Sequence, residues 1–219
     1  FKNAKNIINV IEDINLYDFA TTGPNSFEKI HFLNSKSLKE NKSFSEYMHS
    51  HKTKEFFLKM IEMARVDYHL FTYLCGFVTH YYLDVFTNPF ITYLSGVYDP
   101  SSQGTEEYRG MNQKIKLAMD CYVIKDYYDT KPNAFRINRK ILKLKRISKD
   151  FKETFDKLYS SIYGKIDGYK YVNSAVKWQK FYYFLTFDRF GILNKILTKK
   201  DDGVSNTDLK YISYFNKKL

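Results

Sequence analysis

Residues 66–87 carry the pattern that most constrains the fold, because apolar side chains would occupy nearly every face of a helix formed there. A helix that is apolar all round has to be buried among other elements. Glycine and proline, which weaken or break helices, number only 9 and 4 in 219 residues. We therefore expect a central helix at 66–87, ended or kinked by Pro89, in a chain of long helices.

Other segments also repeat apolar residues at helical spacing, and none alternates with the period of two that predicts a strand. The expected helices are residues 6–14, 43–51, 53–65, 111–128, 137–163, 174–187 and 207–215. Thr53 is the expected N-cap of its helix, and residues 99–110 form the clearest loop. Cys75 and Cys121 are too few for a disulfide framework, so packing must hold the core. The sequence predicts an all-α, single-domain, multi-helix bundle over residues 1–219.

The sequence contains no run of the roughly 18 to 20 uncharged apolar residues that a membrane crossing requires. Its best apolar run, residues 70–78, is followed at once by His80 and Asp84. The first residue is Phe1 rather than Met, so we expect that residues upstream are missing. We expect a cytoplasmic protein, and secretion stays an alternative because of that start.

Positive charge is in excess, since 35 Lys and Arg face 24 Asp and Glu, a net charge of +11. The densest cluster is residues 136–152, where apolar residues recur at roughly helical spacing and predict an amphipathic helix with a solvated basic face. Lys143, Lys145 and Arg146 of this face are candidate contacts for an anionic membrane surface. No specific nucleic-acid module accompanies the cluster.

One face of the central helix is polar. At 100° per residue, His69, Tyr73, Gly76, His80 and Asp84 share that face. Gly76 lets another backbone or a ligand approach closely. Imidazole and carboxylate at positions i and i+4 can converge on one metal ion. The alternative is that Asp84 simply accepts a hydrogen bond from His80 inside a helical core.

Three segments resemble a known family. They are GPN at 23–25, MHxxKTKEFF at 48–57 and HLFTYLCGFVTHYYLDVFTNPFI at 69–91. Together they resemble the zinc-dependent phospholipase C family, in particular its low-GC Gram-positive bacterial branch. The resemblance implies an all-helical fold with a cluster of zinc ions in a cleft between helices. It also implies hydrolysis of phosphodiesters such as phospholipid head groups, and single-strand nucleases share that fold.

The resemblance assigns the metal ligands of the family to particular positions here. Retained family ligands are His49, His80 and Asp84, and the substituted positions are Asn25, Asn88, Asn112 and Lys116. His51 and His69 are candidates to compensate for the lost ligands. Asparagine is a poor zinc ligand, and a lysine ammonium repels cations in a partly desolvated cleft. We therefore expect at most one or two zinc ions, or none if the site is fully degenerate.

Three functions follow as hypotheses. The first is a catalytically impaired homologue of the family that keeps the helical scaffold. The second is an active hydrolase that uses one or two ions at His49, His80 and Asp84 against phospholipid or another phosphodiester. The third is a basic interaction module for anionic membrane or nucleic acid. The sequence has no glycine-rich phosphate loop or serine nucleophile motif that would support another enzyme class.

Overall fold

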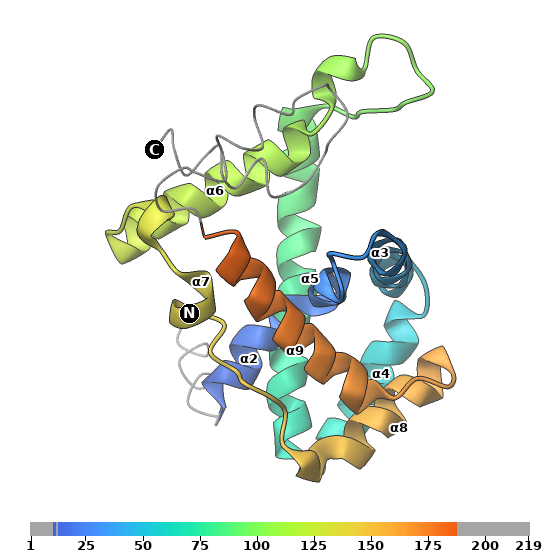
Figure 1. Ribbon diagram of the computed structural model, residues 1–219. Helices are drawn as coiled ribbons and strands as arrows, with labels where there is room; N and C mark the ends of the chain where they lie inside the picture. The colour runs from blue at the N-terminus through green and yellow to red at the C-terminus, as the bar shows by residue number, and fades with distance from the viewer. Residues whose placement is uncertain (1–10, 12, 188–219) are drawn as a thin grey trace. The chain divides into compact units, whose positions relative to one another are not determined.

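The computed structural model describes residue 11 and residues 13–187, and its regular elements there are all helices (Figure 1). The α-helices are α2 (Ile14–Ala20), α3 (Ser35–Ser50), α4 (Thr53–Ala64), α5 (Tyr68–Ser95), α6 (Met111–Tyr128), α7 (Ile137–Lys140), α8 (Lys152–Tyr163) and α9 (Gly168–Leu185). The 3-10 helices are η1 (Gly23–Lys29), η2 (Glu106–Tyr108), η3 (Pro132–Ala134) and η4 (Lys149–Phe151). The all-α prediction is confirmed for these residues. The expected helix at 207–215 lies outside them, as does most of that at 6–14.

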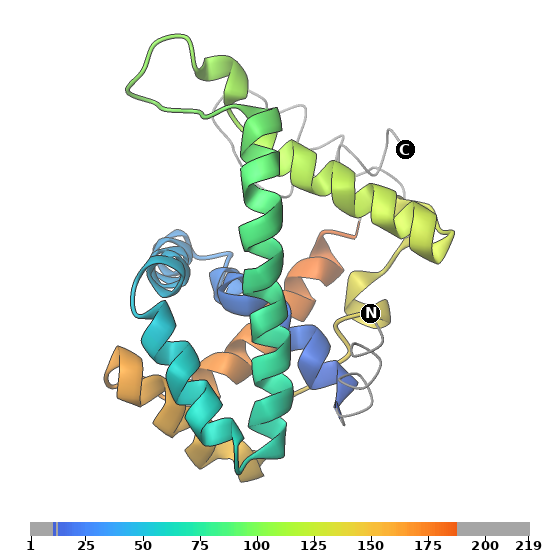
Figure 2. The same cartoon turned by 180° about the vertical axis from the view of Figure 1, so that it is seen from behind.

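The chain divides into two compact units. The first contains the residues up to Tyr82 together with Asn138–Tyr182, and the second contains Leu83–Ile137 and the residues from Tyr183 onward. The division falls inside α5, which both views show as an unbroken helix (Figures 1 and 2). Each unit is described by itself below, and the single-domain expectation stays a prediction.

The core of the first unit is mainly aromatic. Phe27 of η1, Phe56 of α4, Phe77 of α5 and Tyr159 of α8 are each at most 1% exposed. The Phe56 ring centroid lies 5.4 Å from that of Phe77 and 5.3 Å from that of Tyr159. The hydroxyls of Tyr73 and Tyr159 form a 2.9 Å hydrogen bond, which satisfies two polar groups that burial would otherwise penalise. Aromatic burial thus joins four helices without a disulfide.

Helix α5 departs from the expected end at residue 87, because it continues through Pro89 to Ser95. Its earlier part is buried through Leu70, Tyr73 and Phe77, as expected, but Leu83, Val85 and Phe86 are exposed. Proline removes one backbone donor, and the carbonyl of residue 85 loses its usual partner. An exposed helix tolerates this loss because water can reach that carbonyl. None of the described helices combines the length and the apolar content that a bilayer crossing needs.

The prediction of one long helix at 137–163 is wrong. Helix α7 ends at Lys140, α8 begins at Lys152, and residues 141–148 between α7 and η4 form a segment without regular structure, here called the basic strap. Along it, Leu142 and Leu144 are buried while Lys143 and Lys145 are exposed. Buried leucines and exposed lysines therefore alternate along the chain, as in an extended segment rather than a helix.

Side chains of α9 explain why the basic strap does not need helical hydrogen bonds. Asn173 Oδ1 accepts from the backbone N–H of Ile147 at 2.8 Å, and the Tyr169 hydroxyl donates to the carbonyl of Ile147 at 3.1 Å. Lys180 Nζ donates to the carbonyls of Lys143 and Leu144. These bonds satisfy backbone groups that would otherwise be left partly buried and unpaired.

Gly76 marks the point where α2 packs on α5. A Cβ atom added there would lie 2.5 Å from the carbonyl oxygen of Tyr17 and 2.6 Å from the Cβ of Ala20. The close approach expected at Gly76 is therefore made by the backbone of α2. This contact positions the chain that follows α2, including η1.

We predict that Gly76→Ala lowers the free energy of unfolding by about 2 kcal/mol, because overpacking against a backbone oxygen outweighs the gain in helix propensity. Gly104→Ala is the control, since its Cβ would meet nothing within 4 Å and only its φ of +87° is unfavourable. That variant should lose about 1 kcal/mol. Urea unfolding of both measures the difference, and a smaller loss for Gly76→Ala than for Gly104→Ala would contradict the packing.

Candidate metal centre

His49, His80 and Asp84 form a group in which one possible ligand atom of each residue lies within 4.8 Å of those of the other two. His49 lies in the last turn of α3, and His80 and Asp84 lie one turn apart on α5. Because α5 is continuous, the helix itself sets the relation of Asp84 to His80. Among the described residues, no other three His, Cys, Asp or Glu side chains come together in this way.

The His80 imidazole is buried and held in one orientation. Its Nδ1 lies 3.2 Å from the backbone carbonyl oxygen of Thr21. A carbonyl only accepts hydrogen bonds, so Nδ1 carries the proton and Nε2 of the neutral ring carries the lone pair. A backbone partner on the second nitrogen is the usual support of a histidine metal ligand. His80 is therefore prepared to bind an ion through Nε2.

The surroundings of Gly23 explain why the GPN motif begins with glycine. A Cβ atom at Gly23 would lie 2.2 to 2.8 Å from three atoms of the His80 ring, and the residue has a φ of +52°. Both the close contact and the left-handed backbone require glycine. Gly23 begins η1, Pro24 is its second residue, and Asn25 follows beside His49. The motif thus packs against both histidines.

Asn25 contacts His49 directly, since His49 Nε2 lies 3.1 Å from Asn25 Oδ1. The amide oxygen accepts, so Nε2 donates in this arrangement. Coordination of an ion through Nε2 would replace this hydrogen bond, whereas coordination through Nδ1 would keep it. The position where the resemblance expects an aspartate thus carries a neutral amide, and this amide already contacts His49.

The end of α3 is fixed by two side chains that the sequence did not identify as supports of the site. The Tyr81 hydroxyl donates to the carbonyl of Met48 at 2.9 Å. The Thr53 hydroxyl donates to the carbonyls of Met48 and His49 at 2.9 and 3.2 Å. Thr53 was expected to cap α4, but Lys52 with a φ of 54° holds that position. The Thr53 hydroxyl instead satisfies carbonyls that the last turn of α3 leaves open.

The three residues fit one transition-metal ion. Two imidazoles and one carboxylate are ligands that zinc and its neighbours accept. Donors around a tetrahedral zinc ion lie about 3.4 Å apart, given Zn–N distances of about 2.0 to 2.1 Å. Rotation of the His49 and Asp84 side chains would have to bring the donor atoms, now up to 4.8 Å apart, to that spacing. Three protein ligands leave a fourth position open, as in catalytic zinc sites.

The substituted family positions differ in their surroundings. Asn88 lies one turn after Asp84, and its Oδ1 is buried without a hydrogen-bond partner in the described part of the chain. Asn112 and Lys116 lie on α6 of the second unit. Reduced solvation raises the pKa of the Asp120 carboxyl to about 6, although the residue is exposed, and the Lys116 ammonium one turn away lowers it. Asp120 is not among the grouped ligands.

The two candidate compensating histidines lie elsewhere. His51 is exposed, stacks on Tyr47 with ring centroids 4.8 Å apart, and has Nδ1 2.8 Å from the Ser50 hydroxyl. The His69 ring lies 4.1 Å from that of Phe151, about three turns of α5 before His80. The structure brings neither residue into the group with His80.

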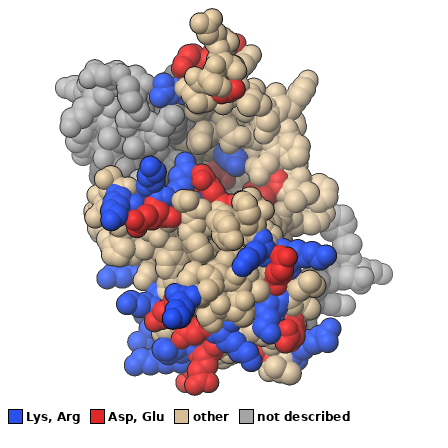
Figure 3. All heavy atoms as spheres, turned by 90° about the vertical axis from the view of Figure 1, so that its right-hand side faces the viewer, with Lys and Arg blue, Asp and Glu red and all other residues tan. Residues whose placement is uncertain are grey.

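The basic residues Lys143, Lys145 and Arg146 lie on the basic strap rather than on a helix, and all three are exposed. Burial raises the pKa of the Asp18 carboxyl, and the nearby Lys143 ammonium lowers it by a smaller amount. Figure 3 shows Lys and Arg scattered among Asp and Glu on the face that it presents. Contact of the basic strap with an anionic membrane or a nucleic acid stays a prediction.

No protein family, curated protein or solved structure was found to match this chain. The family resemblance of the three sequence segments therefore stays a prediction. What the structure adds is the grouping of His49, His80 and Asp84 and the packing of Gly23 and Asn25 against them.

We predict that Gly23→Ala weakens zinc binding by about tenfold or more, since changes to groups that support a ligand typically cost 10- to 100-fold. The added methyl must displace the His80 ring. Competition with a zinc-binding dye measures the affinity, and circular dichroism checks the fold. Gly104→Ala, which also has a positive φ but no neighbour within 4 Å, should bind zinc as the parent does. Equal affinities in a folded Gly23→Ala protein would contradict the role of this contact.

Proposed function

We propose that this protein is a zinc-dependent phospholipase C-like protein with a reduced metal set and impaired hydrolysis. It binds one transition-metal ion through His49, His80 and Asp84. The observation that carries the proposal is the convergence of these three side chains, with His80 held by Thr21. The sequence resemblance supplies the family, and the geometry supports its retained ligands.

The charge balance favours one ion over a cluster. Two divalent ions about 4 Å apart repel each other by about 16 kcal/mol at an effective dielectric constant of 20, four times the value for unit charges. Anionic ligands have to offset that repulsion. Among the positions that the resemblance assigns, Asp84 is acidic, whereas Asn25, Asn88 and Asn112 are neutral and Lys116 is positive. Asp84 is therefore the one anionic ligand of the group.

A site with one metal ion is expected to support only limited hydrolytic chemistry. A bound zinc ion supplies a Lewis acid that lowers the pKa of water and polarises a phosphoryl oxygen. His80 is oriented by the Thr21 carbonyl, and Asn25 Oδ1 accepts a hydrogen bond from His49 Nε2. Without further ions to stabilise both the attacking and the leaving oxygen, hydrolysis of a phosphodiester is expected to be weak or absent.

Elemental analysis of protein purified without chelator tests the metal site. We predict about one zinc ion per chain, which His80→Ala removes because the oriented ligand is lost. His51→Ala is the matched control, since His51 is exposed and outside the group, and it should keep the zinc. Absence of zinc from the parent, or its retention in His80→Ala, would contradict the proposal.

A chromogenic phosphodiester assay on the same three proteins tests the impairment. Turnover at or near background is expected. Fast turnover that His80→Ala abolishes would instead establish the active hydrolase with one or two ions at this site.

Asn25→Asp should strengthen zinc binding by about tenfold or more, because it adds a negative oxygen beside His49. The control is Asn34→Asp, which makes the same charge change at the cap of α3. That position is about 20 Å along the helix from His49. Calorimetric titration with zinc measures both, and an equal gain in the two variants would show that net charge alone is responsible.

A further inference from the structure

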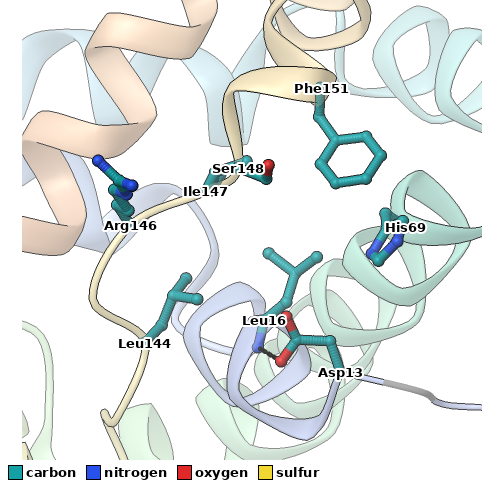
Figure 4. A pocket seen from close by; sticks show the side chains of 8 residues that line it. All are labelled: Asp13, Leu16, His69, Leu144, Arg146, Ile147, Ser148 and Phe151. Carbon is teal, nitrogen blue, oxygen red and sulfur yellow. Dashed lines mark hydrogen bonds between the residues drawn. The ribbon is translucent and has the colours of Figure 1, made fainter.

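A second candidate site lies in the first unit, well away from the metal centre. It is a cavity of about 310 Å³ between the start of α2, the start of α5 and the basic strap (Figure 4). Its lining residues are Asp13, Leu16, His69, Leu144, Arg146, Ile147, Ser148 and Phe151. His69 lies about 16 Å along α5 from His80, so the cavity shares no residue with the group of ligands.

One part of the cavity is apolar. Leu16, Leu144 and Ile147 are 3%, 8% and 2% exposed and form a packed surface. Beside it the rings of His69 and Phe151 lie with centroids 4.1 Å apart and planes inclined by 42°. Pockets for small molecules combine such apolar and aromatic walls with a few polar groups.

The protein uses some polar groups of the cavity and leaves others open. The Ser148 hydroxyl donates to Asp150 Oδ2 at 2.8 Å. No hydrogen bond or ion pair joins the Arg146 guanidinium or the His69 ring nitrogens to another described residue. Asp13 uses Oδ1 to accept from the N–H groups of Asn15 and Leu16. Figure 4 shows the pair of His69 and Phe151 on one side of the cavity and Arg146 at the opposite edge. The exposed Arg146 side chain points away from Leu16 there and has to turn inward to reach a ligand.

The surrounding charge favours an anion. Residues 139–152 contain Arg139, Lys140, Lys143, Lys145, Arg146, Lys149 and Lys152, and the single acidic residue among them is Asp150. Such a basic segment creates a positive potential that attracts anions. Of the exposed strap cations Lys143, Lys145 and Arg146, Arg146 is the one that lines the cavity. A planar guanidinium can hold a carboxylate or a phosphate through two hydrogen bonds.

We propose that this cavity binds a small organic anion with an aromatic or branched apolar body. Arg146 holds the carboxylate or phosphate of the ligand, and the body lies on Leu16 and Leu144 and against Phe151. The Asp13 carboxylate repels the charged end and so fixes which way the ligand lies. The metal centre is not required for this binding.

Calorimetric titration with phenyl phosphate and with benzoate tests the site, with inorganic phosphate as the probe that lacks the apolar body. We expect saturable binding of at least one aromatic anion, at least tenfold tighter than that of inorganic phosphate. Arg146→Met should weaken it by tenfold or more. Lys145→Met is the matched control, because it removes one charge from the neighbouring residue, which is exposed and does not line the cavity. It should change the affinity by less than threefold.

The same titrations in His80→Ala protein separate this proposal from the metal site. Unchanged affinity there supports the cavity, whereas loss of binding would place the anion at the metal centre and overturn the proposal. Equal weakening by Arg146→Met and Lys145→Met would overturn it in favour of diffuse charge attraction. Absence of saturable binding to folded parent protein would overturn it as well. A shift of the His69 ring signals in NMR spectra on addition of the aromatic anion is the expected direct sign of occupancy.

Discussion

Residues 17–25 pack closely against α5 at two glycines, and the candidate metal centre depends on this packing. At Gly76 the carbonyl of Tyr17 occupies the space of a side chain, and at Gly23 the His80 ring does so. The first contact positions α2, and the second brings η1 to the histidines. The Thr21 carbonyl then lies where it can accept from His80 Nδ1. A larger residue at either glycine would move this segment from the helix that carries two of the three ligands.

Much of the helical framework could be predicted, because helical spacing of apolar residues indicates a helix where no distant side chain competes for the backbone hydrogen bonds. Helix α6 has the expected bounds, and α4 ends within one residue of its expected end. The basic strap could not be predicted, because Leu142, Leu144 and Ile147 fit a helical stripe and an alternating segment almost equally well. The extended conformation is favoured by Asn173 on α9, which is distant in sequence and accepts a hydrogen bond from the backbone of the basic strap. Such tertiary hydrogen bonds leave no local trace in a sequence.

The features of the candidate site that depend on local sequence could be predicted, whereas those that depend on tertiary packing could not. Spacing alone placed His80 and Asp84 on one face of a helix. His49 came from the family resemblance, because its approach to α5 depends on how α3 packs. His69 shares the helical face of His80, yet it lies about three turns of helix away, in a cavity beside Phe151. The support given by the Thr53 hydroxyl could not be foreseen, since the same residue type before a helix favours an N-cap.

The central claim is that one transition-metal ion lies among His49, His80 and Asp84. Anomalous diffraction at the zinc absorption edge, from crystals grown with zinc, tests it most directly because it locates the ion. The account predicts one strong anomalous peak within coordinating distance of all three residues, with His80 Nδ1 still within hydrogen-bond distance of the Thr21 carbonyl oxygen. A peak bound to other residues, a cluster of peaks, or no peak between these side chains would contradict it.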